Sequence, residues 1–112
     1  MTNDYAGMGK LYYSIGDVAE ILGENVSLVR FWSDTFPRFI RPKRNAKGNR
    51  LFMADDVEMF KRIHFLVKTE GLTLEGAAKQ LKRDTAKVDR SIRVLESLHR
   101  IREQLESIRK SL

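Results

Sequence analysis

Apolar residues recur along most of this chain at steps of three and four, the spacing that gives an α-helix one apolar face. The first run follows Ser14, whose hydroxyl can cap a helix and which forms a capping-box pattern with Asp17. The run ends at Gly23, because glycine accepts the left-handed conformation that is common after a helix. The pattern predicts a helix over residues 15–22.

A second run begins after Asn25, a favourable N-cap, and ends before Pro37, since proline disfavours a helical conformation in the residue before it. It predicts a helix over about residues 26–35, with Val29 and Trp32 facing the core. The helix then turns four other side chains outward: Ser27, Arg30, Phe31 and Asp34. Two short helices joined by a tight turn are typical of a helix-turn-helix, whose second helix enters the major groove of DNA.

From Pro37 to Thr73 the pattern changes twice. Helical spacing is absent at first, and a turn-rich stretch at residues 45–49 between apolar flanks predicts a small β-hairpin with a basic tip, spanning residues 40–52. Helical spacing then returns and predicts a third helix over about residues 54–69. A short fourth helix should begin after Thr73, which is a suitable N-cap.

The last segment, about residues 84–112, has neither proline nor glycine and predicts one helix, about 40 Å long at 1.5 Å per residue. Its apolar residues alternate in steps of three and four over three heptads, as in the seam of a coiled coil. Val88, Ile92 and Leu95 widen the apolar face only at the start, so the first turns should pack on the chain's own domain. The later positions should need a partner chain: Val94, Leu98, Ile101, Leu105, Ile108 and Leu112.

Together these elements predict a mainly α-helical protein. We expect a flexible N-terminus at residues 1–11, followed at residues 12–83 by four short helices with a β-hairpin, in which the first two helices form a helix-turn-helix. A coiled-coil dimerisation helix should follow at residues 84–112. The composition suits this organisation, because 112 residues with 42% hydrophobic content can form one domain and an appendage.

The charge of the chain is concentrated in the hairpin region. Six of the thirteen residues at positions 38–50 are basic, and no acidic residue occurs between Asp34 and Asp55. The remaining 99 residues contain 15 basic and 15 acidic side chains, so this segment accounts for the net charge of +6. The six are Arg38, Arg41, Lys43, Arg44, Lys47 and Arg50. Such a patch attracts a polyanion; a solvated basic loop is the alternative.

The composition also excludes several kinds of chemistry. The chain has no cysteine, which excludes disulfides, thiol catalysis and thiolate metal sites. Its two histidines, His64 and His99, fall on different predicted helices, and no nucleophile–base pair or glycine-rich phosphate loop is present. No apolar run approaches the ~20 residues of a membrane span, and residues 1–11 lack a signal-peptide core. We therefore expect no enzyme, metal, cofactor or membrane partner, and a cytoplasmic, nucleoid-associated location.

Three blocks of sequence carry a more specific signal. They are residues 13–23 followed by Val29-Arg30-Phe31-Trp32, residues 48–52 followed by Asp56-Val57, and residues 69–75. In residue type and spacing they resemble the DNA-binding domain of MerR-type transcription regulators over residues 12 to about 82. The resemblance implies a winged helix-turn-helix with the hairpin as its wing. By position, Arg30 and Phe31 match an Arg-Tyr pair of DNA contacts, and Arg50 and Phe52 match an Arg and a Tyr on the wing.

The resemblance also implies an assembly and a mode of action. Proteins of this type form homodimers through an antiparallel coiled coil of their C-terminal helices. The dimers bind a pseudo-palindromic promoter site with an overlong spacer, and they bend and underwind the duplex so that RNA polymerase can engage both of its contact elements.

The chain departs from the family pattern at several positions. Phe31, Trp32 and Phe52 replace positions that are usually tyrosine, and Met53 stands where a Ser or Thr usually caps the third helix. The last residues are those of the dimerisation helix, and cysteines of the metal-sensing type are absent. No effector ligand is therefore expected for these residues alone.

The residues and the resemblance together predict a sequence-specific, homodimeric DNA-binding transcription regulator. Its DNA contacts should come from Ser27, Arg30, Phe31, Arg44, Lys47, Asn49 and Arg50. At single positions other roles stay open, because Arg30 could pair with Asp34 and Arg50 could brace the hairpin. The alternative functions are an excisionase-like or architectural DNA-binding factor, and an interaction module whose last helix binds a different protein.

Overall fold

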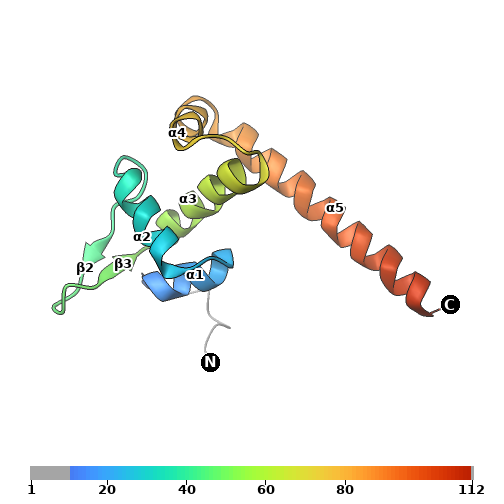
Figure 1. Ribbon diagram of the computed structural model, residues 1–112, viewed down its shortest axis with the longest axis horizontal. Helices are drawn as coiled ribbons and strands as arrows, with labels where there is room; N and C mark the ends of the chain where they lie inside the picture. Colours follow the sequence, from blue (N-terminus) through green and yellow to red (C-terminus); the bar gives the residue numbers. More distant parts are fainter. Residues whose placement is uncertain (1–10, 112) are drawn as a thin grey trace. The chain divides into compact units, whose positions relative to one another are not determined.

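The computed structural model describes residues 11–111 of the chain (Figure 1). The chain divides into two compact units, Met1–His64 and Phe65–Leu112. Apart from Leu11, the predicted flexible N-terminus lies outside the described residues, and so does the predicted seam residue Leu112. The fold is mainly helical with a small three-stranded sheet, as the predicted class required.

The first two helices begin and end where their capping residues predict. Helix α1 spans Ile15–Leu22, and the Ser14 hydroxyl accepts a hydrogen bond from the Asp17 N–H at 3.0 Å while the Asp17 carboxylate accepts one from the Ser14 N–H at 2.9 Å. Gly23 ends this helix with φ 68°, in the left-handed region. Helix α2 spans Val26–Thr35 and is capped by Asn25, whose side-chain oxygen accepts from the Leu28 N–H at 2.8 Å. The helix-turn-helix is thus fixed by local hydrogen bonds.

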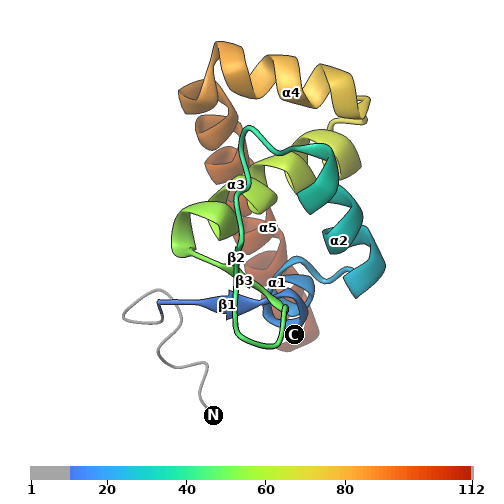
Figure 2. The same cartoon turned by 90° about the vertical axis from the view of Figure 1, so that its left-hand side faces the viewer.

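The hairpin prediction is confirmed but incomplete, because the sheet has a third strand. Strands β2 (Lys43–Arg44) and β3 (Arg50–Phe52) form the antiparallel hairpin, and β1 (Tyr13–Ser14) pairs with the other edge of β3 (Figure 2). Tyr13 lies opposite Phe52 in this pairing, and both side chains are buried. Two residues are too few to reveal the alternation of a strand, so the sequence pattern could not indicate β1.

The third helix also differs from its prediction. Helix α3 spans Ala54–His64, and the chain continues as a π-helical turn, η2, over Phe65–Thr69. The expected single helix over residues 54–69 is therefore correct in extent but wrong in geometry. Periodicity cannot detect such a turn, because one extra residue in one turn leaves the spacing on either side unchanged.

The core of the first unit forms where α1, α2, α3 and the sheet contact one another. Its largest fully buried side chains include Trp32, Phe52 and Phe60. The Phe52 and Phe60 rings meet edge to face with centroids 5.2 Å apart, an arrangement that aromatic pairs favour. Trp32 is 1% exposed, which confirms its predicted place in the core. Strand β3 is thereby held against α3.

The second unit contains η2 and two helices. Helix α4 spans Leu74–Arg83, and its predicted cap Thr73 accepts from the Gly76 N–H at 3.0 Å. Helix α5 spans Thr85–Ser111, and the Asp84 carboxylate accepts from the Lys87 N–H at its start. Val88 is buried, whereas every described residue from position 96 onward is exposed. As expected, only the first turns of α5 pack on the chain itself.

Asp56 joins the start of α3 to the segment that leads into the hairpin. Its carboxylate accepts hydrogen bonds from the N–H of Met53 at 3.1 Å and from the N–H of Arg41 at 3.3 Å, and the residue is 8% exposed. The first bond is the returning half of a capping box. It satisfies the N–H of Met53, whereas a Ser or Thr side chain at position 53 would instead accept from an N–H of the first turn of α3.

Replacing Asp56 by alanine should lower the free energy of unfolding by about 1–3 kcal/mol, because two part-buried N–H groups lose their acceptor. Urea denaturation measures the change. Asp55→Ala is the matched control, since it removes an exposed carboxylate from the same first turn and costs only the helix-dipole contribution, ~0.3–1 kcal/mol. Equal losses in the two variants would show that the Asp56 hydrogen bonds contribute nothing.

Candidate nucleic-acid interface

Helix α2 presents the outward face that its spacing predicts. Ser27, Arg30 and Asp34 are exposed, and Phe31 is 52% exposed although a large apolar residue is costly to leave in water. About half of the Phe31 side chain is thus open to solvent, in contrast to its buried neighbour Trp32. The helix offers a cationic and an aromatic side chain side by side on its free surface.

The tip of the hairpin is ordered by its own hydrogen bonds. The Asn45 side-chain oxygen accepts from the N–H groups of Lys47 and Asn49, both at 3.0 Å. Gly48 has φ 84°, a conformation that favours glycine, and its carbonyl accepts from the Arg44 guanidinium at 2.9 Å. These contacts hold a compact turn from which the side chain of Lys47 extends into solvent.

Arg50 connects the hairpin to α2. Its Nη1 lies 3.0 Å from a carboxylate oxygen of Asp34 and donates to the main-chain carbonyl of Arg30 at 3.3 Å. The Arg50 side chain is only 15% exposed, while that of Asp34 is 63% exposed. The predicted alternative in which Arg50 braces the hairpin therefore describes the observed contact, and Asp34 pairs with Arg50 in place of Arg30.

An open hollow of about 490 Å³ brings the helix and the hairpin together. Its lining contains Ser14, Ile15, Arg30, Arg44, Gly48, Asn49 and Arg50. Four of the seven residues predicted to contact DNA are thus assembled in one place, three of them arginines, and none of the lining residues is acidic. The other three, Ser27, Phe31 and Lys47, are exposed but lie outside this lining.

Besides Gly48 of the hairpin turn, sequence reasoning missed two lining residues of the site, Ser14 and Ile15. They reach the hollow because β1 pairs with β3, which brings the start of α1 to the hairpin. The only sequence signal that could have located them is the capping box at Ser14, and this signal indicates a helix start without indicating its neighbours.

His64 contributes to the packing of the first unit and not to this hollow. Its Nε2 lies 2.9 Å from a carboxylate oxygen of Glu24, and its ring packs edge-on against Trp32. No local pattern indicates this pair, because its members are 40 positions apart. Among residues 11–111, no three His, Cys, Asp or Glu side chains lie close enough together to hold a metal ion.

On α5 the predicted seam forms a continuous exposed apolar stripe. Val94, Leu98, Ile101, Leu105 and Ile108 are each between 51% and 62% exposed. The exposure contrasts with the burial of Val88 at the start of the same helix. Within the described part of the chain, no helix is long and apolar enough to pass through a membrane.

Comparison with known proteins gives consistent results. The family described as MerR HTH family regulatory protein matches residues 13–84. Regulator protein TubY from a Clostridium botulinum C phage is 36% identical over 78 residues, which are 69% of this chain and 32% of that protein. The chain therefore spans about a third of the length of this relative.

Two solved structures resemble the fold. A MerR family transcriptional regulator from Bacillus thuringiensis matches with a TM-score of 0.50 and 22% identity, covering 90% of this chain and 96% of that one. HiNmlR, a MerR family regulator that lacks the sensor domain and was crystallised with promoter DNA, matches with a TM-score of 0.53 and 21% identity, covering 91% and 79%. At these identities the likeness concerns the fold alone. Because the family match covers more than half of the residues and agrees with the observed winged helix-turn-helix, this chain belongs to the MerR family of helix-turn-helix regulatory proteins.

Proposed function

We propose that this protein is a transcription regulator that binds promoter DNA sequence-specifically as a homodimer. The observation that carries the proposal is the hollow in which Arg30 of α2 and Arg44, Asn49 and Arg50 of the hairpin lie together. The duplex has one negative charge per ~1.7 Å of its axis, and a concave surface with three arginines and no acid in its lining complements it. The DNA complex of the structural neighbour HiNmlR supports the same reading.

Helix α2 would enter the major groove with its exposed face toward the bases. Arg30 can donate two hydrogen bonds to the O6/N7 edge of guanine, or it can hold a phosphate. Phe31 has no hydroxyl for a phosphate, but its exposed ring can make an apolar contact with the methyl group of thymine. Ser27, one turn earlier on the same exposed face, can bond either a base or a phosphate.

The hairpin would lie along the backbone beside the groove. Arg44, Lys47 and Asn49 can reach phosphates or the minor groove, because all three side chains are exposed. Arg50 acts differently, since its guanidinium is engaged by Asp34 and the carbonyl of Arg30. We assign it a positioning role that keeps the hairpin at a fixed distance from α2. The DNA-binding part would comprise residues 12–83.

The second half of the proposal is the dimer. Five apolar side chains in one stripe on α5 would be buried by an antiparallel pairing with the same stripe of a second copy, through residues 84–112. Two-fold symmetry of the dimer then requires a pseudo-palindromic operator. Bending and underwinding of that operator would bring the promoter elements into register for RNA polymerase. A protein that acts in this way would work in the cytoplasm, on the nucleoid.

The alternative function is an excisionase-like or architectural DNA-binding factor. The phage origin of the relative TubY is compatible with it. The exposed stripe on α5 favours the dimeric regulator, because a factor that acts as a single winged unit has no use for it. Selection of bound sequences from a random DNA pool separates the two, since an architectural factor would enrich no two-fold-related half-sites.

Replacing Arg30 by alanine should weaken binding to the selected operator by about 1–3 kcal/mol per protomer. Fluorescence anisotropy over a range of salt concentrations measures the change. If Arg30 reads a base, the loss should be confined to the selected sequence. If it holds a phosphate, all sequences should lose affinity, and the log–log salt slope should become shallower by about 0.9 per lost contact.

The control for this variant is Arg109→Ala, which removes the same charge from an exposed position near the end of α5. It should leave both affinity and salt slope close to those of the parent protein. An affinity of the parent protein that does not fall with added salt would refute the proposed function, because no phosphates would then be neutralised.

Comparing Arg50→Met with Arg44→Met should distinguish a residue that positions the hairpin from a residue that contacts DNA directly. Both variants should weaken DNA binding. Only Arg50→Met should also lower the free energy of unfolding, by about 1 kcal/mol, because a mostly buried guanidinium loses a carboxylate and a carbonyl. Arg44 is exposed, so its replacement should change stability by less than about 0.5 kcal/mol. Urea denaturation of both variants makes the comparison, and equal stabilities would remove the bracing role of Arg50.

Leu98→Asp combined with Leu105→Asp should dissociate the dimer, because two carboxylates would have to be buried in the apolar seam. The first unit should stay folded, and affinity for an operator with two half-sites should fall. Sedimentation velocity gives the mass. Arg100→Gln with Ser107→Asp changes the net charge equally on another face of α5 and should leave the dimer intact. A monomeric parent protein, or a dimeric Leu98/Leu105 variant, would contradict the assigned interface.

A further inference from the structure

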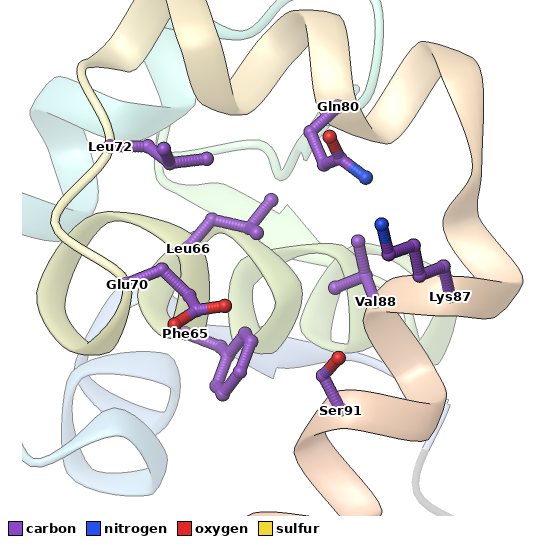
Figure 3. A pocket seen from close by; sticks show the side chains of 8 residues that line it. All are labelled: Phe65, Leu66, Glu70, Leu72, Gln80, Lys87, Val88 and Ser91. Carbon is purple, nitrogen blue, oxygen red and sulfur yellow. The ribbon is translucent and has the colours of Figure 1, made fainter.

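A pocket of about 270 Å³ lies within the second unit, between η2, α4 and the start of α5 (Figure 3). Three buried apolar side chains, Phe65, Leu66 and Val88, contribute to its lining. The volume exceeds the ~150 Å³ of a cavity that takes up benzene. The pocket can therefore accept a molecule the size of one substituted aromatic ring or of a branched alkyl group with polar ends.

Polar side chains complete the lining at several points. They are Glu70, Gln80, Lys87 and Ser91. Within residues 11–111, none of these four side chains has a hydrogen-bond or ion-pair partner in the protein; Glu70 and Lys87 are exposed at the rim of the pocket, and Gln80 and Ser91 are half-buried. In Figure 3 the Glu70 carboxylate lies beside Phe65 on one side of the pocket, and the Gln80 amide and Lys87 ammonium face each other on the opposite side. The pocket thus offers one anionic and one cationic end across an apolar floor.

The π-helical turn produces this arrangement. The N–H of Glu70 donates to the carbonyl of Phe65 at 3.0 Å, a bond over five residues. In an α-helix the corresponding bond spans four residues and would bring Thr69, which has no charge, to that place. Turns of this kind are rare and occur often at functional sites. Because of the extra residue in this turn, the Glu70 carboxylate lies next to the apolar side chains of the pocket.

We propose that this pocket binds a small zwitterion with an apolar body, such as a free aromatic or branched-chain amino acid. The apolar body packs on Phe65, Leu66 and Val88, the ammonium group pairs with Glu70, and the carboxylate lies between Lys87 and Gln80. A ligand with a single charge would pair with only one of Glu70 and Lys87 and would leave the other in water. An uncharged apolar ligand would dehydrate several polar groups without replacing their hydrogen bonds. This site goes beyond the proposed DNA binding and does not depend on it.

Titration of the uniformly ¹⁵N-labelled full chain, without DNA, tests the proposal. Phenylalanine and leucine are the zwitterionic probes, and phenethylamine and 3-phenylpropionate each carry one of the two charges of phenylalanine. At least one zwitterion should give saturable amide shifts at residues 65–72 and 80–91, and phenylalanine should bind about fivefold or more tighter than either single-charge analogue. A bound ligand should also raise the thermal midpoint of the chain.

Two charge-removing variants sharpen the test. Glu70→Gln should remove the preference for phenylalanine over 3-phenylpropionate, and Lys87→Gln should remove the preference over phenethylamine. The controls Glu75→Gln and Lys79→Gln alter exposed residues of α4 that do not line the pocket, and they should leave both preferences unchanged. Thermal melts of the four variants verify that each remains folded.

Two results would overturn the proposal. One is the absence of saturable shifts with both zwitterions. The other is equal binding of phenylalanine and its two analogues, since the charged ends would then take no part. Because the titration contains no DNA, neither result bears on the proposed regulator function.

Discussion

The fixed position of strand β3 is the constraint on which the candidate site depends. Residues 50 and 52 point to the same face of this three-residue strand. Phe52 packs against Phe60 in the core, and Arg50 reaches Asp34 and the main chain of Arg30. Through Phe52 the strand holds the hairpin to the core, and through Arg50 it holds the hairpin to α2. Without both anchors, the arginines of helix and hairpin would have no defined spacing.

The anchors differ in kind, and the difference matters for function. Burial of Phe52 is insensitive to salt, whereas the Arg50–Asp34 pair is partly exposed and weak by itself. An approaching phosphate would compete with Asp34 for Arg50. The hairpin is therefore held firmly to the core by Phe52 and less strongly to α2 by the Arg50–Asp34 pair.

Sequence reasoning succeeded wherever the determining interaction is local. Ser14, Asn25 and Thr73 cap helices through bonds to residues three positions away, and such bonds can be predicted from neighbours alone. The helices followed from these caps and from the apolar spacing, the cationic segment followed from the charge pattern, and the winged arrangement followed from the family resemblance.

The features that were missed depend on contacts between distant or unusually wound segments. Pairing of β1 with β3 joins residues 39 positions apart, Tyr13 and Phe52. The Glu24–His64 contact spans 40 positions. Asp34 forms its ion pair with Arg50, because the hairpin places Arg50 beside it. Sequence separation alone would have favoured a pair with Arg30, which is four positions away. The π-helical turn after His64 leaves no trace in the periodicity.

Helix α5 shows how one element can serve two surfaces. Lys87, Val88 and Ser91 line the pocket, and the exposed stripe begins at Val94, about 4.5 Å further along the axis at 1.5 Å per residue. A 27-residue helix without proline or glycine is stiff over that distance. The occupant of the pocket and the second copy on the stripe would therefore act on consecutive turns of one rigid body. A change in the setting of the first turns would be carried directly into the exposed stripe.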